Sequence, residues 1–220
     1  VEGNRDTLSM RVVVGKKSNQ TSFFYDEIEQ IDYNPYWGVP QSIIVNEMLP
    51  KLYRDPAYLD RAGYEVTDAR GRRISSSAIN WGQYGGKVPF NVRQRPGSSN
   101  ALGELKILFP NKHAIYMHDT PSKNLFERDT RAFSHGCVRL ADPRGMAAAV
   151  LDKPVDYVAA KIGAGHSSEK ITRKIPVYVA YFTAWPDQDG KVDYHADVYD
   201  RDSRVQKALD AIAAVRQPAG

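Results

Sequence analysis

The apolar residues of this chain fall into short runs rich in β-branched and aromatic side chains, several of them closed by a turn or a proline. Such runs are typical of strands, because branched and aromatic side chains pack well on a pleated, half-buried surface. The pattern therefore predicts a mainly β fold with a few helices, of the α+β class. We expect strands over residues 10–15, 21–25, 29–33, 105–109, 114–117, 176–185 and 192–194.

Helical patterns are fewer. Residues 41–49 can form a short helix that Pro50 should stop, because proline has no N–H and clashes with the preceding turn. Asp142 is a typical N-cap, followed by proline in the first turn, for a helix through Leu151. Two further helical patterns cover residues 155–162 and 205–215.

A polar, irregular stretch at residues 50–97 separates the strand-rich regions. A chain of 220 residues can form one core, or one core that carries an inserted lobe. Loops of this length without their own packing are uncommon in compact domains, and the aromatic residues of the stretch can form a small second core. We expect one domain over residues 1–220 with an inserted lobe at 50–97, and the alternative is a long surface loop. The aromatic residues are Tyr53, Tyr58, Tyr64, Trp81 and Tyr84.

Charge and hydropathy argue against two classes of partner. The 30 basic and 26 acidic residues give a formal charge of +4 and are scattered along the chain. This favours a solvated mixed-charge surface over a nucleic-acid-binding patch. No apolar run approaches the roughly 20 residues that a membrane span needs. Residues 1–5 lack the pattern of a signal peptide, so we interpret the sequence as an excised mature domain.

Cys137 is the only cysteine and cannot form a disulfide within the chain. It lies near two histidines, His118 and His135. A cysteine nucleophile needs a nearby base or positive charge to form its thiolate, and imidazole suits this task best near neutral pH. Either histidine can be the base. Gly136, which has no Cβ, lets backbone N–H groups approach a ligand as an oxyanion hole requires.

Two other interpretations of this cluster stay open. The histidines can be ordinary hydrogen-bonding residues around a buried, unreactive cysteine. A metal site is less favoured, because two histidines and one thiol are an incomplete ligand set without a second cysteine or an HExxH pattern. Cysteine chemistry therefore leads, and we expect neither a metal nor another cofactor.

The sequence Ser-His-Gly-Cys at residues 134–137, preceded by His118, resembles the signature of the L,D-transpeptidase, or YkuD, family. Four further segments are similar to the large YcbB-type branch of that family, and the resemblance covers nearly the whole chain. The segments lie at residues 34–40, 95–103, 109–111 and 118–121.

The resemblance implies a β-sandwich catalytic domain with an inserted capping lid, and it implies roles for several residues. Cys137 would be the nucleophile and His118 its base, with His135 as the second candidate. In the family, a backbone carbonyl just after the base orients the imidazole. This corresponds to Asp119, whose carboxylate is the open alternative. Backbone amides around His135, Gly136 and Cys137 would stabilise the oxyanion.

Further substrate-binding residues follow from the same comparison. Ser134 belongs to the motif. Arg139 stands where many relatives have asparagine, and its planar fork can hold a carboxylate of diaminopimelate or of a terminal D-alanine, or form a structural ion pair. Tyr116 shares a strand face with His118 and either lines the pocket or packs in the core. In the lid, Trp81 and Tyr84 either pack the lobe, which we favour, or touch substrate.

The implied activity is peptidoglycan cross-linking in a bacterial periplasm. The thiolate attacks the diaminopimelate–D-alanine bond of a donor tetrapeptide stem, and the resulting thioester passes to an acceptor amine in a 3-3 cross-link. Alternatives within the same chemistry are an envelope protein as acceptor, or water, which would make the enzyme an L,D-carboxypeptidase. A peptidoglycan-binding module without catalysis is the alternative from another class. A carbapenem is expected to acylate Cys137.

Overall fold

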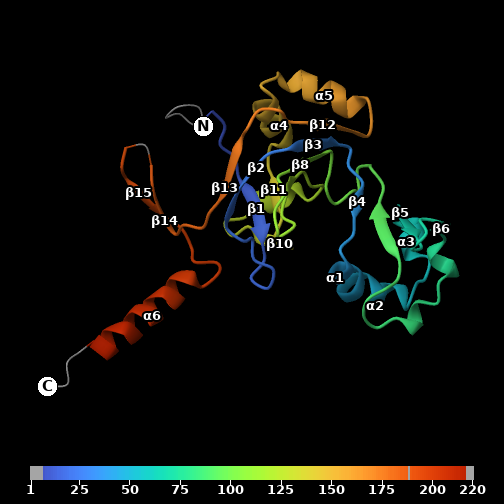
Figure 1. Cartoon of the computed structure of the whole chain (residues 1–220), viewed down its shortest axis with the longest axis horizontal. Coiled ribbons are helices and arrows are strands. Elements are labelled where there is room, and N and C mark those ends of the chain that lie inside the picture. Colours follow the sequence, from blue (N-terminus) through green and yellow to red (C-terminus); the bar gives the residue numbers. More distant parts are fainter. Residues whose placement is uncertain (1–6, 188, 217–220) are drawn as a thin grey trace.

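The computed structural model describes residues 7–187 and 189–216, so the interpretation of residues 1–5 lies outside it (Figure 1). Its centre is a mixed seven-stranded sheet in the order β10-β1-β11-β9-β8-β3-β12. This arrangement of sheets with few helices confirms the α+β class. The strands are β1 (Val12–Gly15), β3 (Gln30–Tyr33), β8 (Leu105–Leu108), β9 (Met117–His118), β10 (Ala132–Ser134), β11 (Val138–Leu140) and β12 (Ser167–Lys170).

One face of this sheet builds the main core. Alternate residues such as Ile31, Ile107 and Leu140 are buried there, because side chains two apart in a strand share a face. The helices α4 (Pro143–Leu151) and α5 (Val155–Gly163) contribute apolar residues to the same core. The two-stranded sheet of β2 (Phe24–Glu27) and β13 (Pro176–Val179) adds Val177.

The capping of α4 agrees with its sequence pattern. The Asp142 carboxylate accepts the N–H of Gly145 at 2.8 Å, and Pro143 stands in the first turn. This confirms the predicted start of the helix. The predicted hairpin between residues 105 and 117 is also present, but its second strand, β9, is only Met117–His118, so the connection is longer than expected.

The opposite face of the sheet carries polar residues. Arg139 of β11 pairs with His118 of β9, and His118 pairs with Lys106 of β8. Residues paired across neighbouring strands project their side chains to the same side. Three basic side chains therefore form a row on the face opposite the main core.

A second compact unit, which we call the lobe, spans residues 37–94 and has its own sheet and its own core (Figure 1). Its sheet runs in the order β4-β7-β5-β6. The lobe begins before residue 50, because the helical segment at residues 41–52 packs into its core. Its elements are β4 (Trp37–Gly38), α3 (Tyr58–Arg61), β5 (Tyr64–Thr67), β6 (Arg73–Ile74), the 3₁₀ turns η2 (Ser76–Ala78) and η3 (Trp81–Gln83), and β7 (Asn91–Gln94).

The predicted stop at Pro50 is wrong. The chain stays helical from α1 (Gln41–Ile43) through the π-helical segment η1 (Ile44–Met48) to α2 (Leu49–Leu52). Pro50 lies in the first turn of α2, where a missing N–H costs little. The preceding π turn, closed by the Leu49 N–H to the Ile44 carbonyl, widens the helix just before the proline.

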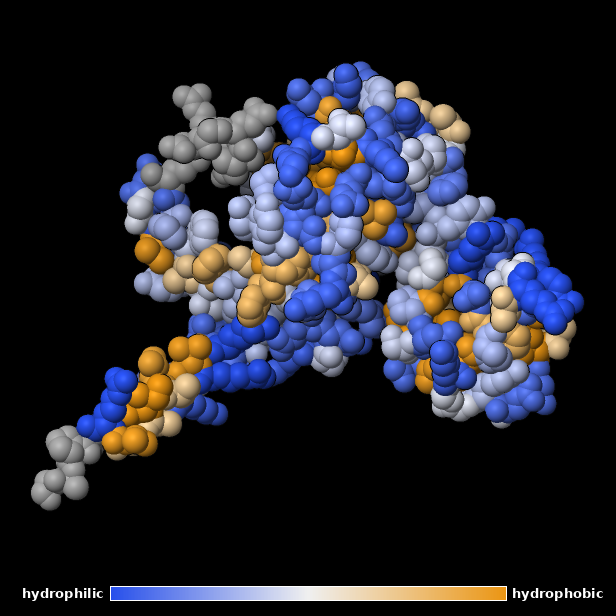
Figure 2. All heavy atoms as spheres, in the orientation of Figure 1, coloured by the Kyte–Doolittle hydropathy of each residue, from blue (hydrophilic) through white to orange (hydrophobic). Residues whose placement is uncertain are grey.

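The C-terminal part differs from the prediction in two ways. The run at 176–185 is split into β13 and β14 (Ala184–Pro186), and β14 forms the predicted hairpin with β15 (Val192–Tyr194). The last helix, α6 (Arg201–Arg216), starts earlier than residue 205 and points away from the sheets (Figures 1 and 2). None of its residues is buried, so its apolar spacing does not serve a core within the described chain.

The described residues contain neither a membrane-spanning helix nor a metal-binding cluster. No helix there combines the length and the apolar character that a membrane crossing requires. No group of three or more histidine, cysteine, aspartate or glutamate side chains in that part of the chain could hold a metal ion.

Trp81 provides a test of the lobe core. Its side chain is 1% exposed and its indole N–H donates to the Ser76 carbonyl at 2.9 Å, so packing, rather than substrate contact, explains it. We expect Trp81→Ala to lower the free energy of unfolding by about 3–5 kcal/mol, because it leaves a cavity and an unpaired carbonyl. Trp185→Ala, at a side chain that is 53% exposed, should cost under about 1 kcal/mol. Urea denaturation followed by circular dichroism measures both, and equal losses would contradict the assignment.

Candidate active site

The cysteine lies in a tight loop between β10 and β11, at residues 135–137. Gly136 has φ +117°, a backbone conformation that side chains rarely adopt. The Ser134 hydroxyl donates to the Cys137 carbonyl at 2.6 Å and accepts the Gly136 N–H at 3.1 Å. Ser134, a predicted site residue, is 1% exposed, so it stabilises the loop from within.

The same loop is tied to the first strand and to the C-terminal segment. The Thr21 hydroxyl donates to the Gly136 carbonyl at 2.8 Å and accepts the Gly15 N–H at 2.9 Å. The Tyr199 hydroxyl, which is buried, donates to the Gly15 carbonyl at 2.6 Å. These bonds fix the backbone around Cys137 from three separate parts of the chain.

His118 is held from one side by the residue that follows it. Its side chain is buried, and Nδ1 lies in hydrogen-bond contact with the backbone carbonyl of Asp119. A carbonyl can only accept, so Nδ1 carries the proton and Nε2 is left as the basic nitrogen. Of the two alternatives for Asp119, the structure therefore places the carbonyl, and not the carboxylate, against the imidazole.

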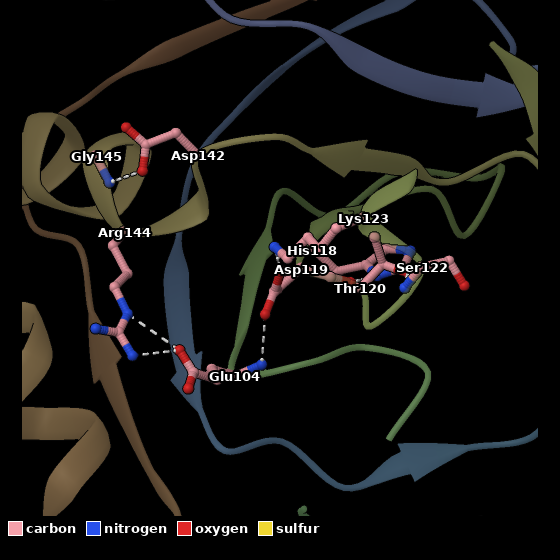
Figure 3. Close-up of polar contacts among 9 residues, drawn as sticks. All are labelled: Glu104, His118, Asp119, Thr120, Ser122, Lys123, Asp142, Arg144 and Gly145. Atoms are coloured by element: carbon pink, nitrogen blue, oxygen red, sulfur yellow. Dashed lines mark hydrogen bonds and ion pairs between the residues drawn. The ribbon is translucent and has the colours of Figure 1, made fainter. Parts of the chain in front are cut away.

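The Asp119 carboxylate points elsewhere (Figure 3). It accepts the Glu104 N–H at 3.0 Å and forms an ion pair with Lys123. Gly103 lies directly against it, with φ +58°, and a Cβ at this position would collide with the carboxylate. The carboxylate thus anchors the turn before β8 and holds the backbone that orients His118.

Tyr116 lies next to both the thiol and the imidazole. Its interaction with Cys137 opposes the rise in the pKa of the thiol, and its ring centroid is 5.6 Å from that of His118. The Cys137 Sγ also contacts the Ala114 carbonyl at 3.8 Å. Among the described residues no hydrogen bond joins Cys137 directly to His118. Cys137 directly precedes β11, which pairs with the strand β9 of His118, and the Val138 N–H is bonded to the Tyr116 carbonyl at 3.0 Å.

Burial and nearby charges set the protonation states of the Cys137 thiol and the His118 imidazole. Burial lowers the pKa of His118 to about 4, and the charges of Arg139 and Lys106 act in the same direction. Burial raises the pKa of the Cys137 thiol, although hydrogen bonds from Tyr116 and the charges of Lys106 and Arg139 oppose that rise. At neutral pH the site therefore holds a neutral thiol and a neutral imidazole, an arrangement in which the imidazole can accept the thiol proton.

The second histidine of the motif faces the lobe. The Nε2 of His135 lies 2.6 Å from a carboxylate oxygen of Glu47, which belongs to the π-helical segment η1. The indole of Trp37, also in the lobe, acts on Tyr116 and opposes the burial-driven rise in the pKa of its hydroxyl. Two contacts thus join the lobe to the side chains next to Cys137.

Three residues of the site were not found from the sequence: Lys106, Trp37 and Glu47. A lysine within the apolar run at 105–109 was a usable signal, because its alternation places it on the face opposite Leu105 and Ile107. Glu47 gave no local signal, because it meets His135 across 88 residues of sequence.

Residues 1–179 match the model of the YkuD family, the L,D-transpeptidase catalytic domain. The chain belongs to this family. It is also 34% identical over 206 residues to a Haemophilus influenzae protein named "Putative L,D-transpeptidase", an alignment that covers 91% of this chain and 42% of that protein. The chain therefore spans less than half the length of this relative. The loop that carries Cys137 lies within the residues that match this YkuD domain, and the segment with Tyr199 lies beyond them.

The protonation of the pair can be tested by alkylation. Because the pKa of Cys137 is raised and that of His118 is lowered to about 4, we expect the rate of iodoacetamide labelling to rise steadily from about pH 6 to pH 9. No reactive plateau should occur between about pH 4 and pH 7, where a thiolate–imidazolium pair would give one. Labelling rates followed by intact mass provide the measurement, and a plateau that His118→Gln removes would refute the neutral pair.

Proposed function

We propose that this YkuD domain is a peptidoglycan L,D-transpeptidase of the cell envelope, in the periplasm, with Cys137 as nucleophile and His118 as general base. The observation that carries the proposal is the buried, neutral His118. The Asp119 carbonyl fixes the tautomer of this imidazole. His118 stands on β9, and the neighbouring strand β11 directly follows the loop that holds the single thiol, Cys137. A purely structural role for His118 would not explain why its basic nitrogen, Nε2, is left available next to the loop of Cys137.

Acylation begins when Nε2 of His118 accepts the thiol proton and the Cys137 sulfur attacks the carbonyl between diaminopimelate and D-alanine. The tetrahedral intermediate needs N–H donors for its oxyanion. The Gly136 N–H is engaged by Ser134, so the Cys137 N–H is the better candidate. When the intermediate collapses, the imidazolium protonates the leaving D-alanine amine, and a thioester remains.

Transfer reverses the proton path. The amine of an acceptor stem attacks the thioester carbonyl and gives a proton to His118, and the thiol is then released as the leaving group. The product is a cross-link between the third residues of two stems. Arg139 lies beside His118 in the sheet and supplies a fixed positive charge for a substrate carboxylate.

The lobe acts as a cap over this site in the proposal. Support comes from its two contacts with the catalytic unit, Glu47 to His135 and Trp37 to Tyr116, both next to Cys137. A cap that excludes water favours transfer of the thioester to an amine over its hydrolysis.

The nucleophile and base are tested with a carbapenem, whose strained lactam can acylate a reactive thiol. We expect a one-to-one adduct on the wild-type chain, none on Cys137→Ala, and at least a tenfold slower reaction on His118→Ala, since removal of a general base typically costs about 10²–10⁴-fold. Intact mass detects the adduct and circular dichroism confirms folding. A folded wild-type chain that never becomes acylated would favour a binding module without catalysis.

The cap is tested through Glu47. We expect Glu47→Gln to lower the ratio of cross-linked to hydrolysed product by about two- to fivefold, because the contact with His135 is partly exposed and contributes about 0.2–1 kcal/mol. Glu65→Gln is the matched control, because Glu65 pairs with Arg93 inside the lobe and does not contact the catalytic loop. Products from stem tetrapeptides are quantified by mass spectrometry. The same ratio in both variants would argue against the cap.

A further inference from the structure

Lys106 has no assigned role, yet its strand position brings it to the reacting groups. It is the direct cross-strand partner of His118, which in turn is paired with Arg139. Its ammonium lies 4.5 Å from the ring centroid of Tyr116, whose ring is in turn 5.6 Å from that of His118. The charge of Lys106 acts on both Cys137 and His118. Lys106 therefore lies close to both reacting side chains.

The two cations of this row lack acidic partners. None of the ion pairs between described residues includes Lys106 or Arg139. The Nε of Arg139 is buried and has no hydrogen-bond acceptor in that part of the chain. Cys137 acts on Arg139 as a negative charge only once its thiol is ionised.

The row also contains an acidic residue, Asp32 of β3. It pairs with Lys106 in the sheet, but no ion pair between described residues joins the two side chains, and the Oδ1 of Asp32 accepts from Gln30 at 2.6 Å and from Ser168 at 2.7 Å. Partly buried cations are usually paired, because leaving a charge without a counter-ion costs free energy. Two of them beside a nucleophile indicate an anion that arrives with the substrate.

We propose that Lys106, together with Arg139, binds a carboxylate of the donor stem and that Lys106 is a specificity-determining residue of this enzyme. The inference rests on the proposed function and adds the chemical group that is recognised. Two carboxylates lie near the scissile bond: the terminal carboxylate of the departing D-alanine and the side-chain carboxylate of diaminopimelate. Both present the same chemistry to a lysine and an arginine.

The experiment compares three donors and three variants. The donors are the tetrapeptide stem, the stem amidated at its D-alanine terminus, and the stem amidated on the diaminopimelate side chain. Lys106→Met removes the charge but keeps the apolar stem of the side chain, and Lys106→Arg keeps the charge. Lys112→Met is the matched control, at an exposed lysine in the turn after β8. The measurement is kcat/KM for D-alanine release.

A carboxylate partner predicts a loss that depends on the donor. Lys106→Met should lower kcat/KM about 10- to 100-fold on the unmodified stem, as expected for a charge-assisted hydrogen bond. Lys106→Met should have little effect on the one amidated donor that lacks the recognised carboxylate. The donor that is insensitive therefore identifies which carboxylate, that of D-alanine or that of diaminopimelate, Lys106 binds. Lys106→Arg should keep most of the activity, and Lys112→Met all of it.

Two results would overturn the inference: no loss in Lys106→Met, or an equal loss on all three donors. An equal loss would mean that Lys106 acts only through its field on Cys137 and His118, and the pH profile of iodoacetamide labelling would then shift to the same extent. Measurement of donor binding distinguishes a failure of this inference from a failure of the proposed function. In the Cys137→Ala background, calorimetry should show that Lys106→Met weakens, by a similar factor, the binding of the two donors that keep the recognised carboxylate, even if no D-alanine release were found.

Discussion

The pairing of β9 with β8 and β11 is the constraint on which the site depends. This strand has only two residues, and its neighbours hold it on both sides. Its register places Met117 in the main core and His118 on the opposite face, between two cations. A slip of one residue would exchange the two side chains and put the imidazole into the apolar core. The buried sheet therefore fixes the position of the proposed base.

The loop that carries Cys137 has little regular structure of its own, and other parts of the chain hold it. Thr21 binds its Gly136 carbonyl, Ser134 braces it from within, and His135 reaches to Glu47 of the lobe. Loop, sheet and lobe are thus coupled at one place.

The sequence predicted which helices and strands form better than it predicted where they begin and end. It also showed the motif around Cys137 more clearly than the residues that surround it in space. The Asp142 cap and the α+β class follow from local patterns, and local patterns are what a sequence displays. Pro50 was misread because proline is tolerated in a first helical turn, and the π turn before it has no sequence signature. The alternation around Lys106 indicates its face of the sheet but not its cross-strand neighbours, and Glu47 reaches His135 by a tertiary contact that no local pattern contains.

The electrostatics of the site contain a conflict that substrate can relieve. Burial and two cations keep His118 neutral, but they also make it a weak base, since its pKa lies near 4. The same cations help the buried thiol to ionise. A carboxylate bound by Lys106 and Arg139 would screen their charge, so the pKa of His118 would rise toward that of a useful base while donor is bound. The strength of His118 as a base would then be coupled to occupancy of the site.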